Sequence, residues 1–235
     1  MDDTQKQIRE LILKENPANP LQYIKYTVKD LFIEKINQAI IECDDCEGCD
    51  RSVKSIGYGN PNATLMIINQ SVSGKQTALN KKIVYPFEQT KEEELLNQMI
   101  EYYQLNKNEI FFVNAMNCYP CTKTSSGVIE RPPGGIQLRN CKIFLNNFIE
   151  AVNPVAILLL GATTLNIFQS GALTKLHGKM IDINGYPGIA TYSLSYLLSM
   201  KDIEPSCFQE FAQDITELLN YIKKEFPNNK LIKGG

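Results

Sequence analysis

Short apolar runs that alternate with amphipathic segments constrain the fold of this chain more than any other feature. Apolar runs at residues 64–68, 110–114 and 155–160 are each long enough for one strand, and a strand pair is predicted at 181–183 and 189–192. Segments with apolar residues at helical spacing lie between and after them, at residues 91–103, 138–152, 162–168 and 208–226. This alternation predicts an α/β domain whose central, mostly parallel sheet is covered by helices on both faces.

The two ends of the chain are expected to lie outside that domain. Residues 1–42 carry apolar residues at helical spacing, interrupted by two prolines near residue 18, and are interpreted as an N-terminal helical extension. The α/β domain is then assigned to residues 43–226. Residues 227–235 are predicted to form a loose C-terminal tail.

The composition limits the cellular setting but says little about partners. The first ten residues, MDDTQKQIRE, are too polar for a secretory signal, and no apolar run is long enough to span a membrane. We therefore expect a cytoplasmic protein without membrane contact, and a monomer. A formal net charge of −2 gives no general support for nucleic-acid binding, although a local basic face is compatible with it.

Cysteines are numerous and clustered. Six of the seven fall in three short stretches: Cys43, Cys46 and Cys49 at three-residue spacing, the C-x-x-C pair Cys118 and Cys121, and Cys141. Cys207 is isolated and is interpreted as a buried free thiol. Because disulfides are disfavoured in the cytosol, clustered thiols indicate an iron–sulfur cluster or structural zinc. A single histidine, His177, argues against a zinc site built on two or three histidines.

The order of several short motifs resembles the iron–sulfur uracil-DNA glycosylases, family 4 of that superfamily. The stretch GYGNPNATLMII at residues 57–68 matches the family pattern G-x-G-N-P-x-A-x-L-M, and it follows the cysteine pair and Arg51. Further matches follow in the family order, at residues 84–87 (VYPF), 113–118 (VNAMNC), 154–161, 177–179 (HGK) and 193–198 (SLSYLL). The resemblance covers roughly residues 43–225 and implies a four-stranded, glycosylase-like sheet.

The resemblance also implies a cofactor and its ligands. A 4Fe-4S cluster would be held by Cys43, Cys46, Cys118 and Cys141, with zinc as the alternative. By spacing alone, Cys49 could take the ligand position assigned to Cys43, and Cys121 could take the one assigned to Cys118.

Two catalytic motifs of the family are altered. The family loop G-E-x-P-G, which helps to place the attacking water, is NQSVS at residues 69–73, and the histidine of H-P-A is Ser193. Water positioning is therefore expected from Asn69 and Gln70, and donation to the departing base from Ser193. The residues expected to contact the base are Phe87, Asn114, Ser71 and His177.

Contacts with DNA are expected from residues that flank these motifs. Lys75 and Lys179 could bind phosphates, Ser195 lies beside Ser193, and Leu197 could wedge into the base stack after flipping.

The resemblance implies a DNA glycosylase that flips out a base and hydrolyses its N-glycosidic bond. Replacement of Gly, Pro and His in the pocket motifs favours a base other than uracil, such as a bulky modified cytosine of phage DNA, and hence a role in phage defence. No lysine occupies an evident nucleophile position, so no lyase step is expected. The alternatives are a catalytically degenerate module that only binds DNA, and a zinc-bound structural domain unrelated to DNA.

Overall fold

The computed structural model describes residues 20–232, with side chains described from residue 28 onward. Its centre is a six-stranded sheet in the order β2-β5-β3-β8-β10-β9. Four strands are mutually parallel: β3 (Leu65–Ser71), β5 (Ile110–Met116), β8 (Ala156–Leu160) and β10 (Tyr186–Thr191). Two short antiparallel strands, β2 (Tyr58–Gly59) and β9 (Met180–Ile183), close the edges. The predicted α/β class and the mostly parallel central sheet are confirmed.

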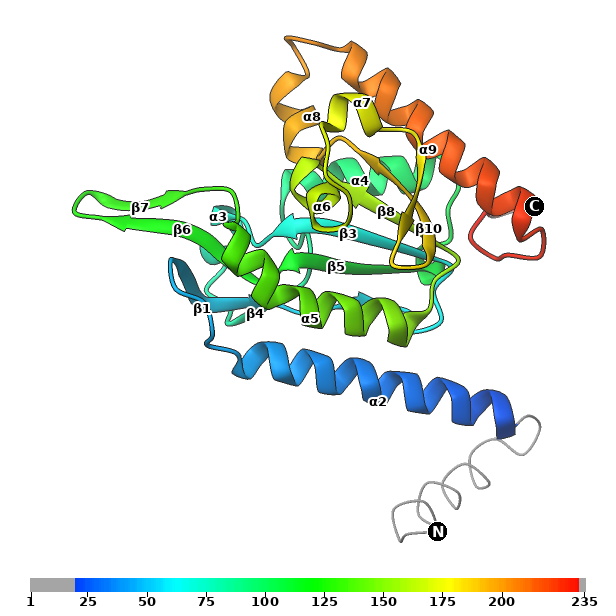
Figure 1. Ribbon diagram of the computed structural model, residues 1–235, viewed down its shortest axis with the longest axis horizontal. Helices are drawn as coiled ribbons and strands as arrows, with labels where there is room; N and C mark the ends of the chain where they lie inside the picture. Colours follow the sequence, from blue (N-terminus) through cyan, green and yellow to red (C-terminus); the bar gives the residue numbers. More distant parts are fainter. Residues whose placement is uncertain (1–19, 233–235) are drawn as a thin grey trace, which may run out of the picture.

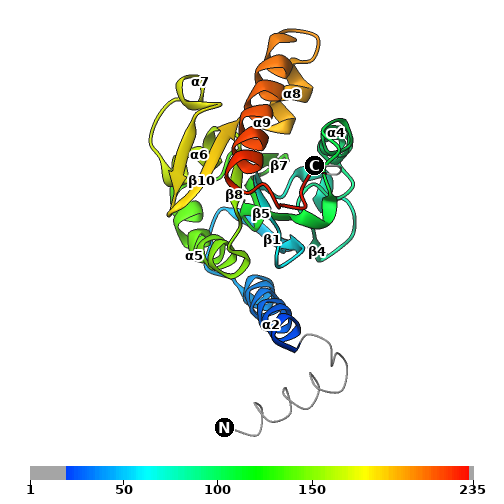
Figure 2. The ribbon, with the colours of Figure 1, turned by 90° about the vertical axis from the view of Figure 1, so that its right-hand side faces the viewer.

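Helices cover both faces of this sheet, as Figures 1 and 2 show. The α4, α8 and α9 helices (Lys91–Tyr102, Leu194–Met200 and Ser206–Glu225) pack on one face, and α2, α5 and α6 (Pro20–Glu42, Gly135–Val152 and Ala162–Phe168) pack on the other. Strand β3 explains why both faces are apolar. Leu65 and Ile67 enter the first core, whereas Met66 and Ile68 enter the second, because side chains alternate along a strand.

A second, smaller sheet was not foreseen. It contains β4 (Ile83–Val84), β1 (Cys49–Ser55), β6 (Cys118–Thr124) and β7 (Gly127–Glu130), in that order. Strands β6 and β7 form a hairpin that projects from the body of the protein (Figure 1). The remaining short elements are α3 (Gly74–Thr77), the 3-10 helix η1 (Lys107–Glu109) and α7 (Leu173–Leu176).

The two chain ends differ from the expected extension and tail. Residues 20–42 are helical, but α2 buries Ile33, Ile36 and Ile40 in the core that α5 shares, so this helix is part of the domain. The prediction of a loose tail is wrong for residues 227–232. Leu231 is fully buried, and its carbonyl accepts a hydrogen bond from the Asn106 amide at 2.6 Å. Residues 1–19 and 233–235 lie outside the described part of the chain.

None of the helices within residues 20–232 combines the length and the apolar character needed to cross a membrane.

Candidate active site

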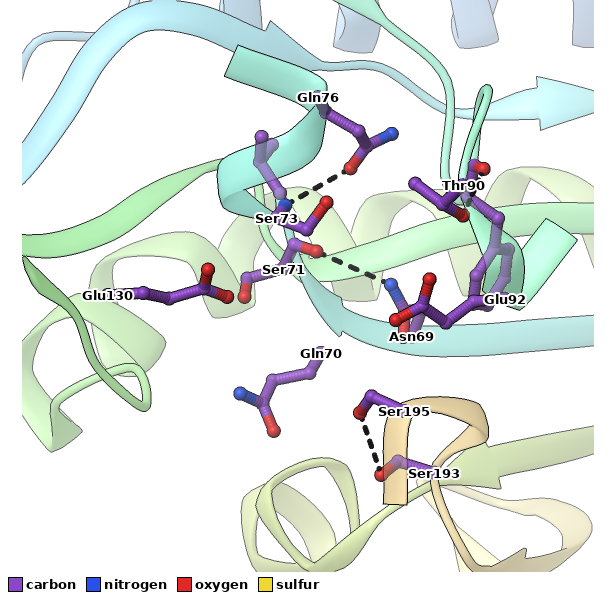
Figure 3. A pocket seen from close by; sticks show the side chains of 12 residues that line it. Asn69, Gln70, Ser71, Ser73, Gln76, Thr90, Glu92, Glu130, Ser193 and Ser195 are labelled. Carbon is purple, nitrogen blue, oxygen red and sulfur yellow. Dashed lines mark hydrogen bonds between the residues drawn. The ribbon is translucent and has the colours of Figure 1, made fainter. Parts of the chain in front are cut away.

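A polar pocket lies where β3 ends, at the carboxyl edge of the central sheet. This edge is where α/β folds commonly bind ligands. Ten of the twelve lining residues are polar or charged, and Val72 and Phe87 are the exceptions; the polar ones are Asn69, Gln70, Ser71, Ser73, Gln76, Thr90, Glu92, Glu130, Ser193 and Ser195 (Figure 3). The pocket thus gathers five predicted residues from the end of β3 and the start of α8: Asn69, Gln70, Ser71, Ser193 and Ser195.

A chain of buried amides fixes the floor of this pocket. The Asn69 Nδ2 donates to Asn114 Oδ1 at 2.9 Å, and Asn114 Nδ2 donates to Ser55 Oγ at 2.8 Å. Asn114 is only 2% exposed and does not line the pocket itself. Its contact with Asn69 commits the Asn69 amide nitrogen and leaves the Asn69 carbonyl oxygen as that side chain's acceptor.

The loop before α4 forms a second wall. Phe87 has a φ of +67°, a conformation that bulky side chains rarely adopt, so the surroundings must impose it. Thr90 helps to do so, because its hydroxyl donates to the Phe87 carbonyl at 2.6 Å and its amide donates to the same oxygen at 3.1 Å. Gln76 anchors the loop from α3 by donating to the Tyr85 carbonyl at 2.8 Å. Phe87 therefore lines the pocket while also packing in the core.

Ser193 forms the opposite wall through a close approach of two chain segments. It is the N-cap of α8, where its Oγ accepts from the Tyr196 amide at 3.3 Å and lies 3.2 Å from Ser195 Oγ. Gly161 faces it with a φ of +94°, and a Cβ there would lie 3.1 Å from Ser193 Cβ. A glycine after β8 is thus required for Ser193 to reach the pocket.

Two carboxylates enter the pocket that the sequence did not predict. Glu130 comes from the end of β7 and accepts a hydrogen bond from the Gly74 amide at 3.1 Å. Glu92 comes from the first turn of α4, and its Oε2 is buried without a partner. The sequence places Glu92 two residues after Thr90, a threonine suited to cap a helix. That pattern predicts the start of a helix along the chain, but it does not show that the helix begins beside the pocket.

The unpartnered polar atoms are concentrated at this pocket. Within the described side chains, two buried side-chain oxygen or nitrogen atoms have no hydrogen-bond partner: Glu92 Oε2 and Ser73 Oγ. Both residues line the pocket. Since buried polar groups in proteins are almost always paired, these two atoms indicate a place built to bind water or a ligand.

Comparison with known proteins agrees with this reading of the fold. Residues 56–216 match the family description "Uracil DNA glycosylase superfamily", which is more than half of the chain. The chain belongs to the uracil DNA glycosylase superfamily. It is also 25% identical over 205 residues to the "Type-4 uracil-DNA glycosylase" of Thermotoga maritima, covering 85% of this chain and 99% of that protein. As a member of this superfamily, it is a DNA glycosylase by class.

In this glycosylase, four cysteines meet at a second, much smaller cavity. Cys43, Cys46, Cys118 and Cys141 all line it, from the segment after α2, the start of β6 and helix α5. The Lys54 ammonium donates to Cys118 Sγ at 3.4 Å, and Asn140 Nδ2 lies 3.7 Å from Cys46 Sγ. These donors are suited to thiolate sulfur. Burial raises the pKa of the Cys141 thiol to about 12, so this thiol needs a cationic group to become a ligand.

The other two cysteines of the clustered stretches, Cys49 and Cys121, lie in different surroundings. Cys49 packs against Cys118 and Cys141, at the edge of the four-cysteine group. Cys121 belongs instead to a separate apolar cluster with Val53. Cys118 and Cys121 are three residues apart on one strand, so their side chains point to opposite faces and cannot share a centre. Across residues 20–232, no three His, Cys, Asp or Glu side chains are arranged to hold a single metal ion.

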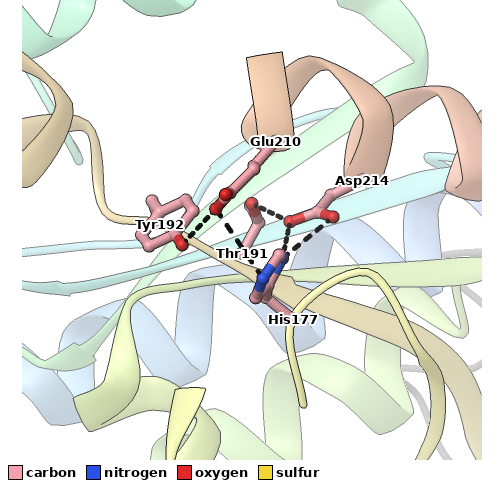
Figure 4. Close-up of polar contacts among 5 residues, drawn as sticks. All are labelled: His177, Thr191, Tyr192, Glu210 and Asp214. Atoms are coloured by element: carbon pink, nitrogen blue, oxygen red, sulfur yellow. Dashed lines mark hydrogen bonds and ion pairs between the residues drawn. The ribbon is translucent and has the colours of Figure 1, made fainter. Parts of the chain in front are cut away.

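His177 must be removed from the residues expected to bind the base. Its Nδ1 lies 3.0 Å from Asp214 Oδ2, and the Thr191 hydroxyl donates to the same carboxylate at 2.6 Å (Figure 4). On its other side, His177 Nε2 lies 3.8 Å from Glu210 Oε2, and Glu210 accepts from the Tyr192 phenol. His177 does not line the pocket, because α9 holds it on these carboxylates.

One of the four expected DNA contacts is wrong. Leu197 has no exposed surface and packs in the core beneath α8, so it cannot wedge between bases. Lys75 is exposed on α3, directly between the pocket residues Ser73 and Gln76. Lys179 is also exposed, but it follows His177 and lies outside the pocket lining.

Proposed function

We propose that this protein hydrolyses the N-glycosidic bond of a modified base in DNA and leaves an abasic site. The observation that carries the proposal is the pocket at the carboxyl edge of the sheet, where Asn69, Gln70 and Ser193 converge with two unpartnered polar atoms. Asn69 and Gln70 orient the attacking water, Ser193 and Ser195 donate to the departing base, and Phe87 stacks on it. Asn114 and Ser71 complete the base-binding set, Asn114 by setting the orientation of the Asn69 amide.

The pocket walls favour a base with a polar substituent. Four serines, three Asn or Gln side chains, a threonine and two glutamates offer many donors and acceptors, and Ser195 is exposed beside Ser193. A site rich in hydrogen-bonding groups selects a ligand that can pair with them, because groups left unpaired cost affinity. A cytosine that carries a bulky hydroxylated group, as in the DNA of some phages, fits these walls and would make the enzyme a defence against phage.

Hydrolysis without a lyase step is the expected reaction. A lyase step requires an amine nucleophile that forms a Schiff base with the sugar. Among the described residues, no lysine lines the pocket. We therefore propose a monofunctional glycosylase. We also propose that it acts on DNA as a monomer in the cytoplasm, with Lys75 and Lys179 on phosphates.

Cys43, Cys46, Cys118 and Cys141 are proposed to hold a 4Fe-4S cluster. The support is their convergence on one cavity beside the ammonium of Lys54. When bound, the cluster would join α2, β6 and α5, and its place would be structural.

The first test measures base release from DNA. Duplexes and single strands containing uracil, hypoxanthine or phage-type modified cytosines are incubated with the protein, and abasic sites are counted after alkaline cleavage. Release of a modified cytosine alone is expected. Release of uracil would contradict the specificity, and DNA binding without any release would favour a module that only binds DNA.

An asparagine pair tests whether the amide chain takes part. Asn114→Ala removes the partner of Asn69 and should lower base release by about 100-fold, the order seen when one preorganised polar contact is lost. Asn147→Ala, at an exposed position on α5, is the control and should release base at the unaltered rate. Equal rates for the two variants would remove Asn114 from the mechanism.

A cysteine pair tests the cofactor. Cys141→Ser should lose the bound iron and its visible absorbance, whereas Cys121→Ser should keep both, because Cys121 packs in a different cluster. Iron and sulfide analysis of the purified proteins checks this. Zinc in the unaltered protein, or iron loss in Cys121→Ser, would overturn the ligand set.

A further inference from the structure

The loop that carries the acidic residue in the resembling family has none here. Residues 69–73 are Asn, Gln, Ser, Val and Ser, which supply amides and hydroxyls but no base. Nevertheless, the pocket contains two carboxylates, which arrive from other elements. The chemistry that the loop has lost can therefore be supplied by a residue that is distant in the sequence.

We propose that Glu92 is the catalytic carboxylate, which binds the attacking water and takes its proton. This inference rests on the proposed glycosylase function and assigns a residue to it. Glu92 lies in the first turn of α4, which begins at Lys91 after the cap Thr90. A helix N-terminus favours negative charge, so the position suits an ionised carboxylate.

Of the two pocket carboxylates, Glu92 is the one with an oxygen available to bind water. Its Oε2 is fully buried and has no hydrogen-bond partner. Glu130 is engaged: its Oε2 accepts a hydrogen bond from the Gly74 amide at 3.1 Å. A carboxylate oxygen with no protein partner in a polar pocket requires water or substrate to satisfy it.

The pocket has room for the water that this role needs. Its cavity volume is about 90 Å³, compared with the roughly 10–15 Å³ that one buried water requires. Asn69 and Glu92 line the same cavity from β3 and α4, and Ser193 and Ser195 line it from α8 (Figure 3). The Asn69 amide nitrogen is committed to Asn114, so its carbonyl oxygen can accept a hydrogen bond from the second O–H of a water that Glu92 holds.

The step balances without any further reactant. The water oxygen bonds to C1′ of the flipped nucleotide as the C1′–N bond breaks, and the bonding electron pair leaves with the base. One water proton passes to the Glu92 carboxylate, and the other remains on the new C1′ hydroxyl. The base then takes a proton from solvent, and Glu92 returns its proton to solvent, which regenerates the carboxylate.

Single-turnover base release by Glu92→Gln and Glu94→Gln tests the assignment. Glutamine keeps the shape of Glu92 but cannot accept the proton, so the rate should fall by about 10²–10⁴-fold. Glu94 is exposed on the same helix, so Glu94→Gln makes the same charge change outside the pocket and should match the unaltered protein. Affinity for a duplex with a non-hydrolysable 2′-fluoro nucleotide should stay within about threefold in both variants.

A carboxylate supplied from solution separates chemistry from structure. Glu92→Ala leaves space in the pocket, so added formate should restore base release in a concentration-dependent manner, with no effect on Glu92→Gln. Glu92→Asp, whose shorter side chain keeps the carboxylate, should retain partial activity.

The outcomes distinguish this inference from the proposed function. If the unaltered protein releases a base and Glu92→Gln releases it equally fast, Glu92 is not the base, and the glycosylase assignment stands. If Glu92→Gln loses affinity for the 2′-fluoro duplex and formate restores nothing, Glu92 reads the substrate instead. If the unaltered protein releases no base from any duplex, the proposed function fails and this assignment fails with it.

Discussion

Two polar clusters lie at the same edge of the central sheet, and they differ in how completely their groups are paired. The His177 cluster at the end of β10 satisfies its members: Asp214 accepts from Thr191 and contacts His177, and Glu210 accepts from Tyr192. The pocket at the end of β3 leaves Ser73 Oγ and Glu92 Oε2 without partners. A conspicuous residue such as the lone His177 can thus be structural, whereas unpaired buried groups identify the place prepared for a ligand.

Removing the acceptor at the centre of the His177 cluster gives the largest expected effect on stability. Burial raises the pKa of Asp214, and hydrogen bonds from Thr191 and His177 oppose that rise. Asp214→Ala leaves both partners without their acceptor and should lower the free energy of unfolding by about 2–4 kcal/mol. Urea unfolding measures the loss, and base release at a temperature well below the midpoint should be unchanged. A stable Asp214→Ala protein that releases no base would place His177 in the active site.

A matched pair of hydroxyl deletions gives a smaller and more discriminating effect. Thr191→Val removes a hydroxyl that donates to a buried carboxylate at 2.6 Å, and should cost about 1.5–3 kcal/mol of unfolding free energy. Ser73→Ala removes a hydroxyl that has no partner, and should change the stability by less than about 1 kcal/mol, in the stabilising direction. Thermal unfolding of the two variants side by side checks this, and equal losses would mean that the contrast between the clusters is wrong.

The sequence predicted the elements that depend on local periodicity. The central strands and α6 were placed correctly because short apolar runs end at polar residues or, after β8, at Gly161, which the positive φ there requires. Strands β3 and β5 run two or three residues further than predicted, to Ser71 and Met116, because pairing with each other continues past the apolar run. Pairing between distant segments cannot be read from composition, and the second sheet was missed for the same reason. The β6–β7 hairpin pairs neighbouring segments, but β7 and the end of β6 are exposed, so they lack the apolar pattern of a buried strand.

The candidate site likewise contains residues that local motifs predicted and residues whose place depends on the tertiary structure. Asn69, Gln70 and Ser193 were singled out by their motifs, and they line one pocket in the structure. The four cysteines chosen in the same way line one cavity. Glu92 could not be predicted, since it enters the pocket from α4, and the sequence does not show that α4 begins beside the end of β3. Leu197 and His177 were misplaced for the converse reason: a position within a motif does not say which side of the helix or strand faces the core.

The attachment of Glu92 to α4, rather than to the segment that follows β3, has an evolutionary consequence. When one short loop both activates water and shapes the base-binding wall, each substitution in it risks the chemistry. In the proposed mechanism the two tasks sit on separate pieces of chain, so residues 69–73 would be free to diversify toward new bases while Glu92, the proposed proton acceptor, stays in place on α4. If the proposed role in phage defence holds, such a division would let the enzyme acquire new base specificities as phages change the modification of their DNA.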